Sequence, residues 1–273
     1  MQEPHYSIAD LLRIMQRLRD PEHGCPWDLQ QDFESIVPST LEECYELAAA
    51  IEAGDYPHLA DELGDVLFQV VFYAQLGAER ELFTFQSVVH GLVDKLLRRH
   101  PHVFAQGRIE GIVDRSAGGA QDTAAVKQQW EQIKADERAQ RAQHGALDDV
   151  PVALPALPRA QKLQKRAARV GFDWPDAAPV FAKIDEELQE LRDAIDRQDA
   201  GEIEDELGDL LFTVVNLSRH LKIDAEAALR RASSKFERRF SSMERACAEQ
   251  NTVLEALDAA AMELLWDQAK ASV

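Results

Sequence analysis

The chain has 273 residues, of which 49 are acidic and 30 are basic, so its formal net charge is −19 at pH 7. Binding to nucleic acid is not expected of so acidic a chain, because binding without regard to sequence depends on clustered basic side chains. A hydrophobic fraction of 45% predicts a folded core, and the lack of a secretory leader or membrane-length apolar run predicts a cytoplasmic protein with no membrane segment.

Helical periodicity runs through nearly the whole sequence and predicts an all-α fold. The first helix covers residues 8–18, with Ser7 and Asp10 as its capping box. Ser39 with Glu42 predicts a second capping box, opening a helix that Gly54 ends. The same reasoning places the later helices from Pro57 onward and over 85–99, 130–142, 159–169, 179–198, 202–221, 225–248 and 258–270.

The helices divide into two predicted domains. Residues 146–158 contain three prolines and are expected to form a hinge between an N-terminal repeat, 1–145, and a C-terminal repeat, 159–273. The stretch 107–123, which contains four glycines, is the best candidate for a loop. Two repeats of this size suit a chain too long for one ordinary domain.

The two halves repeat one pattern of carboxylates at one spacing. The displacement is 144 positions throughout, as in 187 − 43 and 206 − 62. The repeated acidic residues are Glu43, Glu46, Glu62 and Asp65 in the first half, and Glu187, Glu190, Glu206 and Asp209 in the second. A solvated helix face has no reason to keep such a register, whereas a cation site does.

The spacing within each copy predicts a metal site. Residues three apart share a helix face, so two consecutive antiparallel helices can bring two pairs of carboxylates together. Four carboxylates repel one another unless a cation lies between them, and oxygen-only ligands favour Mg²⁺, with Mn²⁺ as a substitute. A di-iron site in a helical bundle uses Glu-x-x-His, a pattern that the sequence lacks.

Basic and aromatic residues late in each repeat are candidates for contacts with a substrate. Lys235 and Arg239 lie one turn apart and match Lys95 and Arg99 of the first repeat. A Trp-x-x-x-Lys pattern occurs as Trp130 with Lys134 and as Trp266 with Lys270. The lysines and arginine can neutralise phosphate charge, and an indole can stack on a nucleobase of any identity.

Several motifs together resemble the MazG group of all-α nucleoside triphosphate pyrophosphatases, which also includes dimeric dUTPases and phosphoribosyl-ATP pyrophosphohydrolases. Besides the carboxylate pairs, the resemblance rests on GCPWD at 24–28, RRHPHVF at 98–104, WEQIK at 130–134, VGFDW at 170–174 and KFERRF at 235–240. Helix pairs of this kind leave apolar faces uncovered, and closing them into four-helix units needs a second copy or a second chain, so we expect a homo-oligomer and specifically a dimer. The implied reaction is Mg²⁺-dependent hydrolysis of NTPs and dNTPs between the α and β phosphates, giving a monophosphate and pyrophosphate.

The resemblance also assigns roles to individual residues. Glu187, Glu190, Glu206 and Asp209 would hold Mg²⁺, and Glu186 would add a ligand or orient the attacking water. Asn216 matches an asparagine typical of the family, whereas the first repeat has Phe72 at that position. We therefore expect the C-terminal repeat to be the main catalytic unit, without excluding activity in the first.

Two other readings stay open at this point. The chain is alternatively a regulatory or scaffold protein whose metal sites are structural, or a hydrolase narrowly specific for dUTP or phosphoribosyl-ATP. The biological role implied by the family is cleaning of the nucleotide pool or control of stress nucleotides, and the residues do not choose between them.

Overall fold

The computed structural model describes residues 5–113, 125–126, 129–130, 132–133, 137, 145–148 and 150–272. Most of the expected loop at 107–123 and of the expected helix at 130–142 lies outside these residues. The chain forms two compact units, 1–135 and 136–273, and each is described by itself. Among the described residues, β structure is limited to an isolated bridge between Phe104 and Ile112, so the predicted all-α fold is confirmed.

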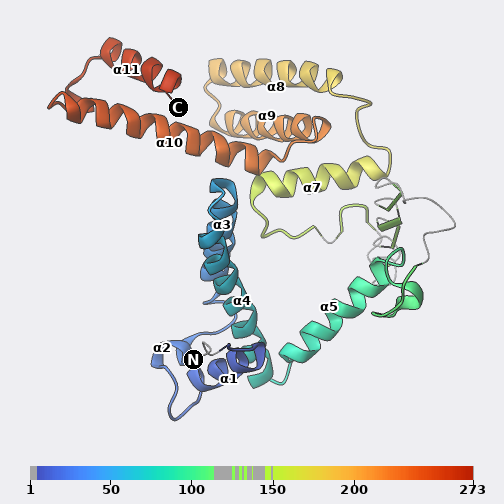
Figure 1. Cartoon of the computed structure of the whole chain (residues 1–273). Coiled ribbons are helices and arrows are strands. Elements are labelled where there is room, and N and C mark those ends of the chain that lie inside the picture. The colour runs from blue at the N-terminus through green and yellow to red at the C-terminus, as the bar shows by residue number, and fades with distance from the viewer. Residues whose placement is uncertain are drawn as a thin grey trace. The chain divides into compact units, whose positions relative to one another are not determined.

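The N-terminal unit is built on an antiparallel pair of long helices, against which shorter helices pack (Figure 1). Its helices are α1 (Ile8–Leu18), α2 (Pro26–Gln30), α3 (Val37–Ala53), α4 (Tyr56–Glu79) and α5 (Phe85–Arg99), followed by a single 3₁₀ turn, Ala105–Gly107. Helix α4 packs against α3, α1 and α5. The core consists of Met15 from α1, Ile36, and Val71, Phe72 and Leu76 from α4.

The helix ends show which sequence signals hold. The Ser7–Asp10 capping box is present, and Gly54 ends α3 with φ of 69°, so both predictions are confirmed. The capping box at Ser39 is wrong, because α3 begins at Val37 and Ser39 lies inside its first turn. Helix α3 can include Pro38, because a proline in the first turn has a suitable φ and the N–H group that it lacks would have no partner in the helix.

The C-terminal unit repeats the paired long helices. Its helices are α7 (Ala156–Arg169), α8 (Ala178–Arg197), α9 (Ala200–His220), α10 (Ala225–Glu249) and α11 (Ala259–Ser272), with a 3₁₀ turn at Leu254–Ala256. Helix α9 packs against α8, α7 and α10, and α11 folds back on α10 (Figure 1). The predicted hinge is too long by three residues, because 156–158 form the first turn of α7.

The two long hairpins turn at equivalent positions. Gly54 and Gln198, which differ by 144, both adopt the left-handed conformation that ends the first helix of the pair. Asp55 and Asp199 then cap the second helix through their carboxylates. The same register that relates the carboxylates therefore also relates the turns, which fixes how the second helix returns along the first. No helix among the described residues is long and apolar enough to cross a membrane.

Candidate metal and nucleotide site

Three of the four predicted carboxylates of the C-terminal unit converge. Glu187 and Glu190 on α8 and Glu206 on α9 each place a carboxylate oxygen within 4.8 Å of the others. Glu187 is buried, at 4% exposed, whereas Glu190 is exposed. Asp209 is exposed one turn beyond Glu206 and lies outside this set of three. The predicted hairpin thus brings carboxylates of α8 and α9 together, and Asp209 remains outside the cluster.

The electrostatics of the cluster favour a cation. Burial raises the pKa of Glu206 above its ordinary value, and the charges of Glu190, Glu187 and Asp209 raise it further. A carboxyl group surrounded by like charges resists ionisation unless a positive charge is supplied. The oxygen donors present are those that a hard divalent ion prefers.

The N-terminal unit carries a second cluster made in the same way. Glu43 of α3 and Glu62 and Asp65 of α4 converge within 4.8 Å, and Glu46 is left out of the set. Burial raises the pKa of Glu43, with further contributions from the charges of Asp65, Glu46 and Glu62. The Oε2 atom of Glu62 is buried and has no hydrogen-bond partner, which is a deficit that a bound cation would satisfy.

A lysine that the sequence reasoning missed lies against the C-terminal cluster. Lys183 Nζ is 2.8 Å from Glu186 Oε1 and 2.9 Å from Glu187 Oε1. The hydrogen bonds that Lys183 donates to Glu186 and to Glu187 raise its pKa, the one to Glu186 most. The spacing of three and four residues within α8 was the available signal. The N-terminal repeat has Ser39 at this position (183 − 144) and instead places His58 Nε2 2.9 Å from Glu62 Oε1.

The predicted substrate contacts of the last two helices form a separate group. Lys235 is exposed on α10. The Arg239 guanidinium lies 5.8 Å from the centre of the Trp266 ring. The centres of the Phe236 and Trp266 rings are 5.5 Å apart. Lys270 Nζ is 2.6 Å from Asp267 Oδ1. These residues belong to the α10–α11 pair, whereas the carboxylates belong to α8 and α9. Lys134 lies outside the described residues.

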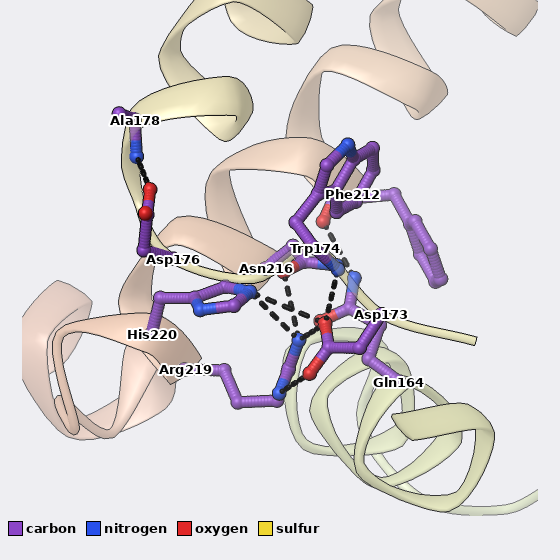
Figure 2. Close-up of polar contacts among 9 residues, drawn as sticks. All are labelled: Gln164, Asp173, Trp174, Asp176, Ala178, Phe212, Asn216, Arg219 and His220. Carbon is purple, nitrogen blue, oxygen red and sulfur yellow. Dashed lines mark hydrogen bonds and ion pairs between the residues drawn. The ribbon is translucent and has the colours of Figure 1, made fainter. Parts of the chain in front are cut away.

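Asn216 is held in a polar network between α9 and the segment before α8 (Figure 2). The Asp173 carboxylate accepts two hydrogen bonds from the Arg219 guanidinium, one of them 2.9 Å long, and lies 3.2 Å from His220 Nε2. The Arg219 hydrogen bonds hold the pKa of Asp173 below its usual value. Arg219 Nη2 also donates to Asn216 Oδ1 at 3.1 Å. Asp173 and Arg219 are 46 residues apart, so no local pattern predicted their contact.

Sequence comparison explains why the pattern occurs twice. The sequence model of the MazG nucleotide pyrophosphohydrolase domain matches residues 31–104 and again residues 179–243. The chain belongs to this family. Each matched segment contains one of the two carboxylate clusters, so the MazG domain is present as two copies, each with its own long hairpin.

Similar proteins cover nearly the whole chain. A nucleoside triphosphate pyrophosphohydrolase of Escherichia coli strain K12 is 51% identical over 268 residues, which are 97% of each chain. A Thermotoga maritima protein named nucleoside triphosphate pyrophosphohydrolase/pyrophosphatase MazG is 43% identical over 270 residues, 99% of this chain and 98% of its own. The Bacillus subtilis protein YabN is 39% identical and matches 97% of this chain over 52% of its own length.

Proposed function

We propose that the C-terminal MazG unit hydrolyses nucleoside triphosphates to a monophosphate and pyrophosphate with the help of Mg²⁺. The observation that carries the proposal is the convergence of Glu187, Glu190 and Glu206 from two helices within 4.8 Å. The two relatives that match over nearly their full length are named nucleoside triphosphate pyrophosphohydrolases, which supports the hydrolase part of the proposal. The acidic surface of the chain requires a local positive charge if a polyphosphate is to bind.

The residues of the cluster fit Mg²⁺, with Mn²⁺ as the substitute. Glu187 and Glu190 of α8 and Glu206 of α9 would hold the ion, and the exposed Asp209 could add a fourth carboxylate. When bound there, the ion would neutralise phosphate oxygens and lower the pKa of a bound water. Hydrolysis then joins a water oxygen to the α phosphorus and breaks its bond to the bridging oxygen, which leaves with pyrophosphate.

The neighbouring side chains can position the water and the phosphates. Glu186 is on the exposed side of α8, where its carboxylate can accept a proton from water or orient it. Lys183, which holds Glu186, offsets negative charge beside the cluster. Lys235, Arg239 and Lys270 would bind phosphates if α10 and α11 close on the substrate, and Trp266 would pack against the nucleoside.

A homodimer would cover a repeated apolar stripe. Leu207, Leu211 and Val214 of α9 are 46%, 52% and 43% exposed. The first repeat exposes the equivalent Leu63, Leu67 and Val70 of α4 at 53%, 40% and 42%. A stripe at i, i+4 and i+7 forms one helix face, and two such faces can pair into a four-helix unit. We propose this pairing, a broad range of NTP and dNTP substrates, and a cytoplasmic role in nucleotide-pool cleaning or stress-nucleotide control.

Product analysis by anion-exchange chromatography tests the activity. Purified protein is incubated with each common NTP and dNTP, in Mg²⁺ and in EDTA, and we expect monophosphate and pyrophosphate only with the metal. Glu206→Gln should lower turnover at least 100-fold, since even residues that merely support metal ligands contribute about 10- to 100-fold. Glu204→Gln removes an equal charge from an exposed position of the same helix and should change little.

The other outcomes lead to different conclusions. Diphosphate and phosphate as products would mean that a different bond is cut. Absence of turnover with every nucleotide would refute the proposed enzymatic activity and favour the scaffold alternative. In that case Glu206→Gln would lower stability or partner binding, with no turnover to lose. Turnover confined to one nucleotide would replace the broad range with the narrow hydrolase.

A further inference from the structure

A histidine lies against the carboxylate cluster of the N-terminal unit. His58 Nε2 is 2.9 Å from Glu62 Oε1, one turn away on α4. The equivalent residue of the C-terminal unit is Glu202 (202 − 144 = 58), whose carboxylate accepts two hydrogen bonds from the Arg197 guanidinium. The N-terminal cluster thus has an imidazole nitrogen beside it at a position where the other copy has a carboxylate that is already engaged.

The N-terminal cluster also lacks the lysine that contacts its counterpart. Lys183 lies 2.9 Å from Glu187, and the equivalent residues of the first repeat are Ser39 and Glu43. A serine hydroxyl carries no charge, so it cannot offset the three carboxylates that converge within 4.8 Å. Carboxylates brought this close together repel one another unless a cation is supplied. The need for a bound ion is therefore greater in the N-terminal unit.

Glu62 is the buried member of this cluster. Its side chain is 7% exposed, and its Oε2 atom is buried without a hydrogen-bond partner. The same residue supplies one of the three oxygen atoms that lie within 4.8 Å of one another. A buried carboxylate oxygen without a partner is destabilising. A metal ion in the cluster would supply the missing partner.

The histidine belongs to the same helix face as two of the acids. His58, Glu62 and Asp65 follow one another at intervals of four and three residues, so they form one stripe of α4. Glu43 meets this stripe from α3, which packs against α4 along the hairpin. One nitrogen donor and three oxygen donors from two helices are thus available to a single ion.

The separation of His58 from Glu62 suits two ligands of one ion. Two donor atoms bound at right angles, each about 2.0–2.1 Å from the ion, lie about 2.9 Å apart. His58 is not among the three groups that lie within 4.8 Å of one another, so its ring must turn toward them to bind. Its side chain is 57% exposed, and the cap of α4 uses its backbone N–H, which donates to Asp55. The ring can therefore turn without disturbing the helix.

We propose that the N-terminal unit binds a divalent transition-metal ion of the Zn²⁺ type through His58, Glu43, Glu62 and Asp65. Imidazole is a good ligand for Zn²⁺ and its neighbours in the transition series, whereas Mg²⁺ takes oxygen ligands and keeps several waters. The bound ion would join α3 to α4 and satisfy the buried oxygen of Glu62. The two repeats then select different metals, and this inference does not depend on the hydrolysis proposed for the C-terminal unit.

Calorimetric titration with Zn²⁺ in millimolar Mg²⁺ tests the site. The full chain carries Glu206→Gln, so that the C-terminal cluster has lost a ligand, and we expect it to bind one Zn²⁺. His58→Gln keeps an amide that can donate to Glu62, and it should weaken Zn²⁺ binding by more than about 100-fold, the upper effect of a residue that only supports a ligand. Glu62→Gln should abolish binding. His90→Gln is the matched control, because it removes an imidazole from an exposed position of α5 in the same unit.

Titration of the same variants with Mg²⁺ alone separates a ligand from a supporting residue. We expect His58→Gln to leave the Mg²⁺ dissociation constant near that of its parent, since the ion binds the carboxylates. Equal losses of Zn²⁺ and Mg²⁺ affinity would overturn the proposal, because His58 would then only orient Glu62. Undiminished Zn²⁺ binding by His58→Gln with native helicity would also overturn it, as would the absence of Zn²⁺ binding in the parent. None of these results bears on NTP turnover by the wild-type chain in Mg²⁺.

Discussion

Replacing Lys183 with methionine tests whether the C-terminal carboxylate cluster needs a cation. Methionine keeps an apolar stem of similar length and removes the charge that contacts Glu186 and Glu187. The side chains of Lys183 and Glu187 are 31% and 5% exposed, so their ion pair is intermediate between an exposed pair and a buried one. Loss of an exposed pair costs about 0–1 kcal/mol and of a buried pair about 3–5 kcal/mol. We expect the free energy of unfolding of the C-terminal unit to fall by about 1–3 kcal/mol in EDTA.

Urea unfolding followed by fluorescence gives this number. Trp27 and Trp130 are first replaced by phenylalanine, so that the two remaining tryptophans both report on the C-terminal unit. Arg192→Met is the matched control, since it removes a positive charge from an exposed position of α8 and should change the free energy of unfolding by less than about 0.5 kcal/mol.

The same measurement in millimolar Mg²⁺ decides the interpretation. A divalent ion among Glu187, Glu190 and Glu206 replaces the missing positive charge, so the difference between Lys183→Met and wild type should shrink. Equal differences in EDTA and in Mg²⁺ would show that the lysine acts only through local packing. A Lys183→Met variant as stable as wild type in EDTA would refute the claim that the cluster is strained by its own charge.

Three further predictions concern pH, the hairpin turn and the core of the N-terminal unit. The pKa of Glu206 is raised in the folded state, so at pH values above the ordinary glutamate pKa the folded state binds more protons than the unfolded chain. The contribution of Glu206 to stability should therefore grow as the pH falls from 7 toward about 4.5. Chemical denaturation of wild type and Glu206→Gln in EDTA at several pH values checks this, and a difference between them that does not vary with pH would contradict it. Gln198→Gly should stabilise the C-terminal unit by about 0.5–1 kcal/mol, since Gln198 has φ of 56°, and equal or lower urea resistance would count against this. Phe72→Asn should destabilise the N-terminal unit by at least about 3–5 kcal/mol, whereas Ala78→Asn, at an exposed position of the same helix, should have a small effect in unfolding curves.

The fold was largely predictable because helical periodicity and caps are local signals. Ser7 and Gly54 mark helix ends correctly, since a capping box and a left-handed glycine act within a few residues. The errors fall at prolines. Helices α3 and α7 begin before Pro38 and Pro158, because proline is compatible with the first turn even though it disrupts the interior of a helix. A sequence rule that stops at every proline therefore starts these helices late.

The site was predictable where the chain repeats itself and unpredictable where it does not. The displacement of 144 marked both carboxylate clusters, because equivalent positions far apart in sequence had kept the same chemistry. The contacts of Asp173 with Arg219 and of Gln164 with Phe212 join segments 46 and 48 residues apart and occur in one unit alone. Only the packing of α7 and the segment before α8 on α9 brings these groups together.

The differences between the repeats are therefore as informative as their common features. Both units keep three converging carboxylates, but the first has a buried Phe72 where the second has a buried Asn216. Replacing a core phenylalanine by a small polar residue costs about 3–5 kcal/mol unless other contacts compensate. In the C-terminal unit the compensating contacts are polar, because Arg219 binds both the Asn216 amide and Asp173. Arg219→Met should therefore lower the free energy of unfolding of the C-terminal unit by about 1–3 kcal/mol in urea denaturation, and a variant as stable as wild type would show that these contacts do not compensate for the missing core packing.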